Sequence, residues 1–120
     1  MYKEIVIGAG EHQKTIGFLS NGATPLFYKQ VFKNDLLQML TGGGQMEIAS
    51  DKIPELAFIM AKQAEKADMT KVNYNGFVDW LSQFEPLDLV IKSTEIADVY
   101  IGDSMTSVEP KKNGKGKAKG

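Results

Sequence analysis

The sequence predicts an α+β fold that is mainly helical, in which three to four helices follow an N-terminal β-hairpin. Three observations support this fold class. Two short runs of β-forming residues, 2–7 and 14–19, stand at the start with a polar turn between them. Apolar residues then recur at helical spacing through much of 24–102. The final stretch, 106–120, is rich in Lys and Gly and offers almost no side chain to bury.

The hairpin is predicted from the runs YKEIVI at 2–7 and KTIGFL at 14–19. Ile16 and Phe18 fall on one face of the second strand, and the glycines and polar residues between the runs supply the turn. A hairpin alone is only marginally stable. We therefore expect it to pack on helices or to pair with another strand, and we expect its edge to be a contact surface for another subunit or a partner.

The segment 24–40, TPLFYKQVFKNDLLQML, is predicted to be one helix. Thr24 is a suitable capping residue, and Pro25 takes the favoured first position. The helix is apolar over more than the ~100° that one core face requires, so part of it is expected to serve a second surface. The alternative is a fully buried central helix. The apolar positions are Phe27, Val31, Phe32, Leu36, Leu37, Met39 and Leu40.

Glycines 42–44 are predicted to end this helix and form a joint. They do not form a phosphate loop, because such a loop needs Lys and then Ser or Thr after its last glycine, whereas Gln45 and Met46 follow here.

A second helix is predicted to start at Ser50 or Asp51, with Pro54 tolerated in its first turn. Phe58 lies off the apolar stripe of this helix and is a candidate exposed anchor for a partner. Scattered exposed apolar residues are also common on protein surfaces and need no function. The stripe itself consists of Ile53, Leu56, Ala57, Met60, Ala64 and Ala67.

A third helix is predicted over about 74–84, capped by Asn73 or Asn75. It carries a broad aromatic face around Trp80, which we expect to be a core anchor; the alternative is an interface hot spot.

The segment 87–101 fits both strand and helix, and we favour a helix interrupted near Ser93. Gly102 suits the end of that helix.

The net charge of −1 conceals an asymmetry between the body and the tail. Residues 1–109 hold nine Lys and all fifteen acidic residues, whereas 110–120 hold five Lys and no acid. We predict a single globular domain over 1–105 and a disordered tail over 106–120. A basic tail can contact phosphates, but the absence of Arg and of interleaved aromatics argues against specific nucleic-acid binding.

The residues carry no set of groups that suits catalysis or metal binding. The chain has no Cys, and His12, its one histidine, stands in the predicted turn without a nucleophile or a further ligand. Asp51 and Glu55 share a helix turn, which favours a solvated acidic face. We predict a protein that is not an enzyme and has no cofactor or metal.

No signal-peptide pattern opens the chain, and no window approaches the ~20 apolar residues of a membrane span. The expectation is a soluble intracellular protein without a membrane partner.

In the order of its features, the chain resembles the tail assembly chaperones of long-tailed bacteriophages, especially those that infect Gram-positive hosts. The resemblance covers most of the chain, but none of its pieces is a strict chemical signature. The pieces are YKEIVIG, TPLFYKQVFKNDLLQML, PELAFIMAKQAEKADMT, YNGFVDWLSQFEP and the Lys-rich end.

This resemblance implies a non-enzymatic protein that self-associates, binds the tape measure protein and the tail tube protein in the host cell cytoplasm, and is absent from the mature virion. It also implies a longer second form made by ribosomal frameshifting. The pair Lys112 and Asn113 is compatible with a slippery codon run, as any Lys-Asn pair is.

The candidate partner-binding residues are aromatic and aliphatic side chains that exceed the needs of one core face: Phe27, Tyr28, Val31, Phe32 and Phe58. Two other interpretations stay open. One is a structural virion protein of the tail or head-joining region, and the other is a small nucleic-acid-associated protein acting through its basic tail.

Overall fold

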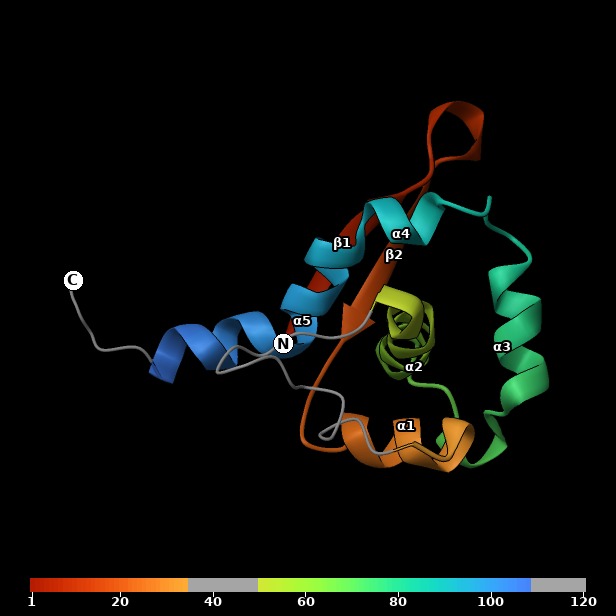
Figure 1. Ribbon diagram of the computed structural model, residues 1–120. Coiled ribbons are helices and arrows are strands. Elements are labelled where there is room, and N and C mark those ends of the chain that lie inside the picture. Colours follow the sequence, from red (N-terminus) through yellow and green to blue (C-terminus); the bar gives the residue numbers. More distant parts are fainter. Residues whose placement is uncertain (35–49, 109–120) are drawn as a thin grey trace.

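The computed structural model describes residues 1–34 and 50–108, the last seven of these by their backbone alone. Within these residues the fold is α+β, with an N-terminal antiparallel hairpin followed by helices, as the sequence predicts. Figure 1 shows helix α2 (Ile53–Ala64) at the centre, with the hairpin, helix α1 (Thr24–Phe32) and helix α3 (Tyr74–Leu81) arranged around it.

The hairpin has the predicted strand limits, β1 Tyr2–Ile7 and β2 Lys14–Leu19, in antiparallel register. One face carries buried Ile5, Ile7 and Phe18. The connection contains a short 3₁₀ turn, and Gly8 within it has a φ of +90°, which L-residues other than glycine rarely adopt. Alternating burial and the glycine turn, both readable in the sequence, therefore fix this element.

Eight of the twelve residues of helix α2 are buried, and they lie on more than one face of the helix. Leu56 and Met60, four residues apart, share one face of the helix and Phe58 lies on another, yet all three are buried. Full burial of such a side chain stabilises the fold by roughly 1.5–3 kcal/mol. The predicted start is close to the observed one, since a 3₁₀ turn over Ser50–Lys52 leads directly into the helix.

Helix α1 spans Thr24–Phe32, so the prediction of one continuous helix over 24–40 is wrong at Lys33 and Asn34. Lys33 adopts a left-handed φ of +62°, and its backbone N–H donates to the carbonyl of Lys29, 2.8 Å away. This left-handed residue terminates the helix. The polar residues after Phe32 indicated the end of the helix, but the prediction followed the apolar spacing that continues to Leu40. Residues 35–49, including the predicted glycine joint, lie outside the described residues.

Thr24 is not the cap of α1 but its first residue, and its hydroxyl joins two segments. The Thr24 Oγ1 accepts from the backbone N–H of Asn21 at 3.0 Å and donates to Gln63 Oε1 at 2.7 Å. Gln63 in turn donates to the side chain of Asn21 at 3.2 Å. This buried network ties the start of α1 to the end of α2.

Helix α3 spans Tyr74–Leu81, and the predicted cap is confirmed because Asn73 Oδ1 accepts from the backbone N–H of Gly76 at 2.9 Å. The helix ends three residues before the predicted limit at 84. A 3₁₀ turn over Met69–Lys71 connects α2 to it.

The C-terminal part contains helix α4 (Asp88–Ile91) and helix α5 (Ser93–Val108). The predicted interruption near Ser93 is confirmed, because the two helices break at Lys92. Gly102 does not end α5, which continues to Val108 and past the expected domain limit at 105. Helix hydrogen bonds tolerate a single glycine at a cost of about 1 kcal/mol. Residues 109–120 lie outside the described residues.

Candidate functional site

The predicted partner-binding residues lie mostly in the core rather than on the surface. Phe58 is 1% exposed, so the prediction that it is an exposed anchor is wrong. It lies off the stripe of α2, but α2 has neighbours on every side, and a residue off the stripe is therefore buried as well. Tyr28 is also fully buried. Neither ring is available to a partner in this fold.

An aromatic cluster joins three of the five candidates. The ring of Phe32 lies 5.1 Å from that of Tyr28 and 6.5 Å from that of Phe58, measured between centroids. Phe32 also meets Phe77 of α3 edge-on at 4.9 Å. Edge-on pairs of this kind add roughly 0.5–1.5 kcal/mol beyond the area that they bury. Phe32, Phe27 and Val31 are partly buried against the core, so α1 uses its wide apolar face for packing.

Glu55 belongs to the same core edge. Its carboxylate accepts a hydrogen bond from the hydroxyl of Tyr28 and lies 3.9 Å from the ammonium of Lys52. Burial and this hydrogen bond raise the pKa of Tyr28 above its ordinary value. The acidic pair Asp51 and Glu55 is thus not wholly solvated: Asp51 is exposed, but Glu55 serves the core.

The most exposed apolar group of the described residues that sequence reasoning missed is the α4 patch, made of Leu87, Val90 and Ile91. These side chains are 62%, 47% and 72% exposed. Their spacing of three and four residues makes them neighbours on one helical turn, while Leu89 on the opposite side is buried. The run 87–91 is uniformly apolar apart from one Asp, so the sequence held no signal for which side would face the solvent.

Both edges of the hairpin carry outward-pointing backbone groups. Just beyond the strand ends, Met1 and Ser20 exchange two hydrogen bonds, at 2.6 and 2.8 Å. Bonded and non-bonded pairs alternate along an antiparallel ladder. It follows that the N–H and C=O groups of three residues on each strand point away from the ladder: Tyr2, Glu4 and Val6 on β1, and Thr15, Gly17 and Leu19 on β2. Within the described residues, none of these backbone groups bonds to another segment.

Two hollows flank the C-terminal half of α2. The α2–α3 groove, of about 560 Å³, is lined by Phe58, Lys62, Lys71, Asp79 and Trp80, among others. The β2 hollow, of about 520 Å³, lies where β2 meets the ends of α2 and α3. Lys62 and Trp80 line both, so the two hollows adjoin at these side chains. Their sizes fall within the ~300–1,000 Å³ of ordinary ligand pockets.

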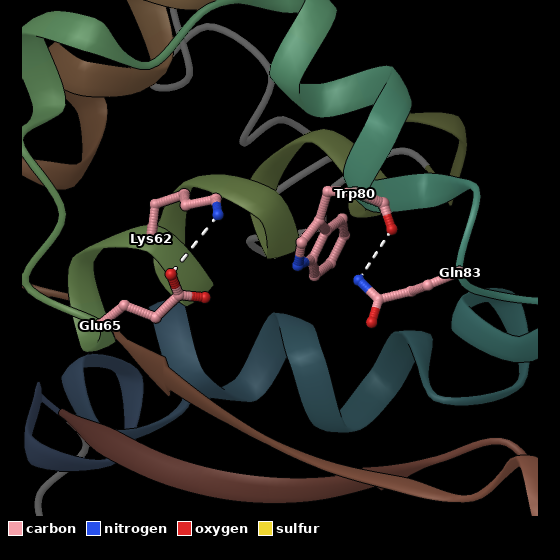
Figure 2. A network of polar contacts seen from close by, with 4 residues as sticks. All are labelled: Lys62, Glu65, Trp80 and Gln83. Carbon is pink, nitrogen blue, oxygen red and sulfur yellow. Dashed lines mark hydrogen bonds and ion pairs between the residues drawn. The ribbon is translucent and has the colours of Figure 1, made fainter.

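Trp80 is the side chain that separates the two hollows. It is 8% exposed, which confirms its prediction as a core anchor. Its ring packs at 5.7 Å from that of Phe58 and 4.9 Å from that of Phe84. Figure 2 shows the nitrogen edge of the indole turned toward the side of Lys62 and Glu65, away from Gln83. Among the described residues no acceptor receives the indole N–H, although buried indoles usually have one.

The remaining candidates for chemistry do not form a constellation. His12 is exposed in the hairpin turn, as expected. Asp68 caps a 3₁₀ turn, and the hydrogen bonds that it accepts from Thr70 lower its pKa. No group of three metal-ligating side chains occurs in the part of the chain that is described. Over the same residues, no helix has the length and apolar character to span a bilayer. Lys112 and Asn113 lie outside the described residues.

Comparison with known proteins gives no relative. No protein-family model, no curated protein and no solved structure matches the chain.

Proposed function

We propose that the protein acts without catalysis as a tail assembly chaperone, binding the tape measure protein, the tail tube protein or both while the tail of a long-tailed bacteriophage assembles. The order of sequence features supports this proposal over most of the chain. The observation that carries it in the structure is the exposed apolar surface of the α4 patch, because exposed contiguous apolar side chains mark protein contact sites.

The α4 patch replaces the core aromatics as the proposed client surface. Its three side chains stand on one turn, on a helix whose opposite side is anchored by buried Leu89. A partner that covers these side chains removes apolar area from water without unfolding any element. A client protein that later polymerises carries apolar surface of its own, which a chaperone must cover until assembly begins.

The proposal includes location and expression. The chaperone works in the host cell cytoplasm, is absent from the finished particle, and has a longer form that arises by frameshifting near Lys112 and Asn113. Expressing the gene with its native downstream DNA and searching the products by mass spectrometry tests for that form. A product that shares residues 1 to about 112 and then changes frame supports the proposal.

Binding is tested with the purified full chain and the tail tube and tape measure proteins of the same phage. Replacing Leu87 and Ile91 together by Asp places two charges on the α4 patch, and we expect at least tenfold weaker binding, equal to about 1.4 kcal/mol. The matched control replaces Tyr74 and Val78 of α3, which are also exposed, by Asp. Binding of neither tail protein by the wild type would refute the function, and equal binding by the two double variants would exclude the α4 patch.

A further inference from the structure

We infer that the β2 hollow is a binding site for an extended segment of a partner polypeptide, which adds to β2 as a third strand and accepts a hydrogen bond from the indole N–H of Trp80. This inference deepens the proposed function and rests on it in one respect, namely that the ligand is a polypeptide. It concerns a different surface from the α4 patch.

Strand β2 carries backbone groups that its ladder with β1 does not use. The N–H and C=O groups of Thr15 and Gly17 point away from the ladder, because both residues belong to non-hydrogen-bonded pairs. Thr15, Ile16 and Gly17 line the β2 hollow together with residues of α2, so this part of the strand borders an open space beside the helix. An added strand satisfies such an edge with main-chain hydrogen bonds.

The indole of Trp80 offers a further hydrogen-bond donor beside this strand. A donor that is more than nine-tenths buried and has no acceptor within the described residues is costly, by about 1–3 kcal/mol for a polar group left unsatisfied. The indole lines the β2 hollow together with Thr15 and Gly17. A carbonyl oxygen of an added strand would give this donor its partner.

The walls of the hollow favour a single strand over a second folded copy. Besides the strand, the hollow is lined by Lys62, Ala64 and Glu65 from the end of α2 and by Trp80 and Gln83. Lys14 Nζ donates to Gln83 Oε1 at 3.1 Å, which joins the strand to the segment after α3 and limits the opening at that end. We therefore take an extended chain, rather than a second folded copy, as the occupant.

Lys62 adds a second donor to the site. Its ammonium lies 3.4 Å from Glu65 Oε1 and 5.8 Å above the ring of Phe58. Figure 2 shows it on the same side of the indole as Glu65, so two donors, the ammonium and the indole N–H, flank one space. Oxygen acceptors, which every peptide carries, are therefore the ligand chemistry that the hollow suits.

The test removes each feature separately in the full chain. Thr15→Pro deletes an outward N–H of β2 without removing a ladder bond, and Val6→Pro does the same on β1 at the residue paired with Thr15. Trp80→Phe deletes the indole N–H and keeps an aromatic ring. We expect Thr15→Pro to weaken binding of the tail tube or tape measure protein at least tenfold and Trp80→Phe about three- to tenfold, with Val6→Pro close to the wild type. Circular dichroism confirms that each variant is folded.

A second readout uses the sole Trp, whose indole N–H gives one resonance in a ¹⁵N correlation spectrum. Saturation with the bound tail protein, or with the segment of it that binds, should shift that resonance. Wild-type binding that survives both Thr15→Pro and Trp80→Phe, with an unshifted indole resonance, would overturn the site and leave the proposed function standing.

If neither tail protein binds the wild type, a random dodecapeptide library displayed on phage replaces them as the probe. Peptides enriched on the wild type and lost on Thr15→Pro and Trp80→Phe, but retained on Val6→Pro, would support the site while the proposed function fails. No enriched peptide, or peptides equally retained on all the variants, would overturn the site. Deleting 109–120 shows whether the chain's own tail competes with the displayed peptides for the hollow. If peptides are enriched only after this deletion, the tail is the occupant of the hollow and the assignment to a partner polypeptide is overturned.

Discussion

Helix α2 and helix α4 are both rich in large apolar residues, but only α2 is surrounded. In α2 buried side chains lie on more than one face, and they include Phe58, which lies off the apolar stripe. In α4 Leu89 is buried, whereas Ile91 is among the most exposed apolar residues of the described part of the chain. The difference is the number of neighbouring elements: α2 contacts the hairpin and four helices. Apolar composition therefore shows that an element contains core residues, and the packing around it decides how many of its sides are core.

The comparison predicts the largest loss of stability at the centre of α2. Phe58→Ala removes a buried ring that contacts Phe32, Phe77 and Trp80. We expect the free energy of unfolding to fall by about 3–5 kcal/mol, the usual cost of a cavity from Phe. Urea denaturation followed by circular dichroism measures it. A loss below about 1 kcal/mol would mean that Phe58 is a surface residue after all.

A smaller loss is expected where α1 meets the end of α2. Thr24→Val keeps the shape of the side chain but leaves Gln63 Oε1 and the backbone N–H of Asn21 without the Thr24 hydroxyl. Unsatisfied buried polar groups cost roughly 1–3 kcal/mol. Thr24→Ser is the matched control, since it retains the hydroxyl, and it should recover most of the loss in the same denaturation experiment.

Tyr28→Phe should lower the free energy of unfolding by less, about 1 kcal/mol at neutral pH. The loss is small because the Glu55 carboxylate, deprived of the Tyr28 hydroxyl, still has the ammonium of Lys52 nearby. The effect is pH-dependent with a defined sign. The pKa of Tyr28 is raised in the fold, so its contribution is complete below the ordinary tyrosine value near 10 and is lost as the pH rises above it. Thermal denaturation should therefore show wild-type stability falling more steeply than that of Tyr28→Phe above pH ~10. Parallel curves would contradict the assignment.

The smallest effect is expected on the α4 patch. Ile91→Ala removes a side chain that is mostly exposed, and the free energy of unfolding should change by less than about 0.5 kcal/mol. Leu89→Ala, two residues earlier and buried, is the control and should cost about 2–5 kcal/mol. Similar losses in the two variants would show that both sides of α4 are covered, which would remove the patch from the proposed function.

Local signals in the sequence predicted the elements well. The strands at 2–7 and 14–19, the Asn73 cap and the break near Ser93 depend on contacts within a few residues of each other. The two main errors had different origins, one local and one tertiary. The end of α1 at Lys33 was missed because periodicity is a weaker guide than a local polar break. Phe58 was misplaced because a helical stripe assumes one core face, whereas α2 has several.

The candidate site was harder to predict than the fold. The sequence by itself determined that the chain folds as a hairpin with helices, that Trp80 anchors the core, and that the hairpin edges are contact candidates, because these follow from alternation, spacing and residue type. Only the tertiary structure decided that Tyr28 and Phe58 are buried, that Leu87 and Ile91 are exposed, and that Thr15, Lys62 and Trp80 border one hollow. These residues are far apart in the chain, and their proximity depends on how separate elements pack, which no local pattern encodes.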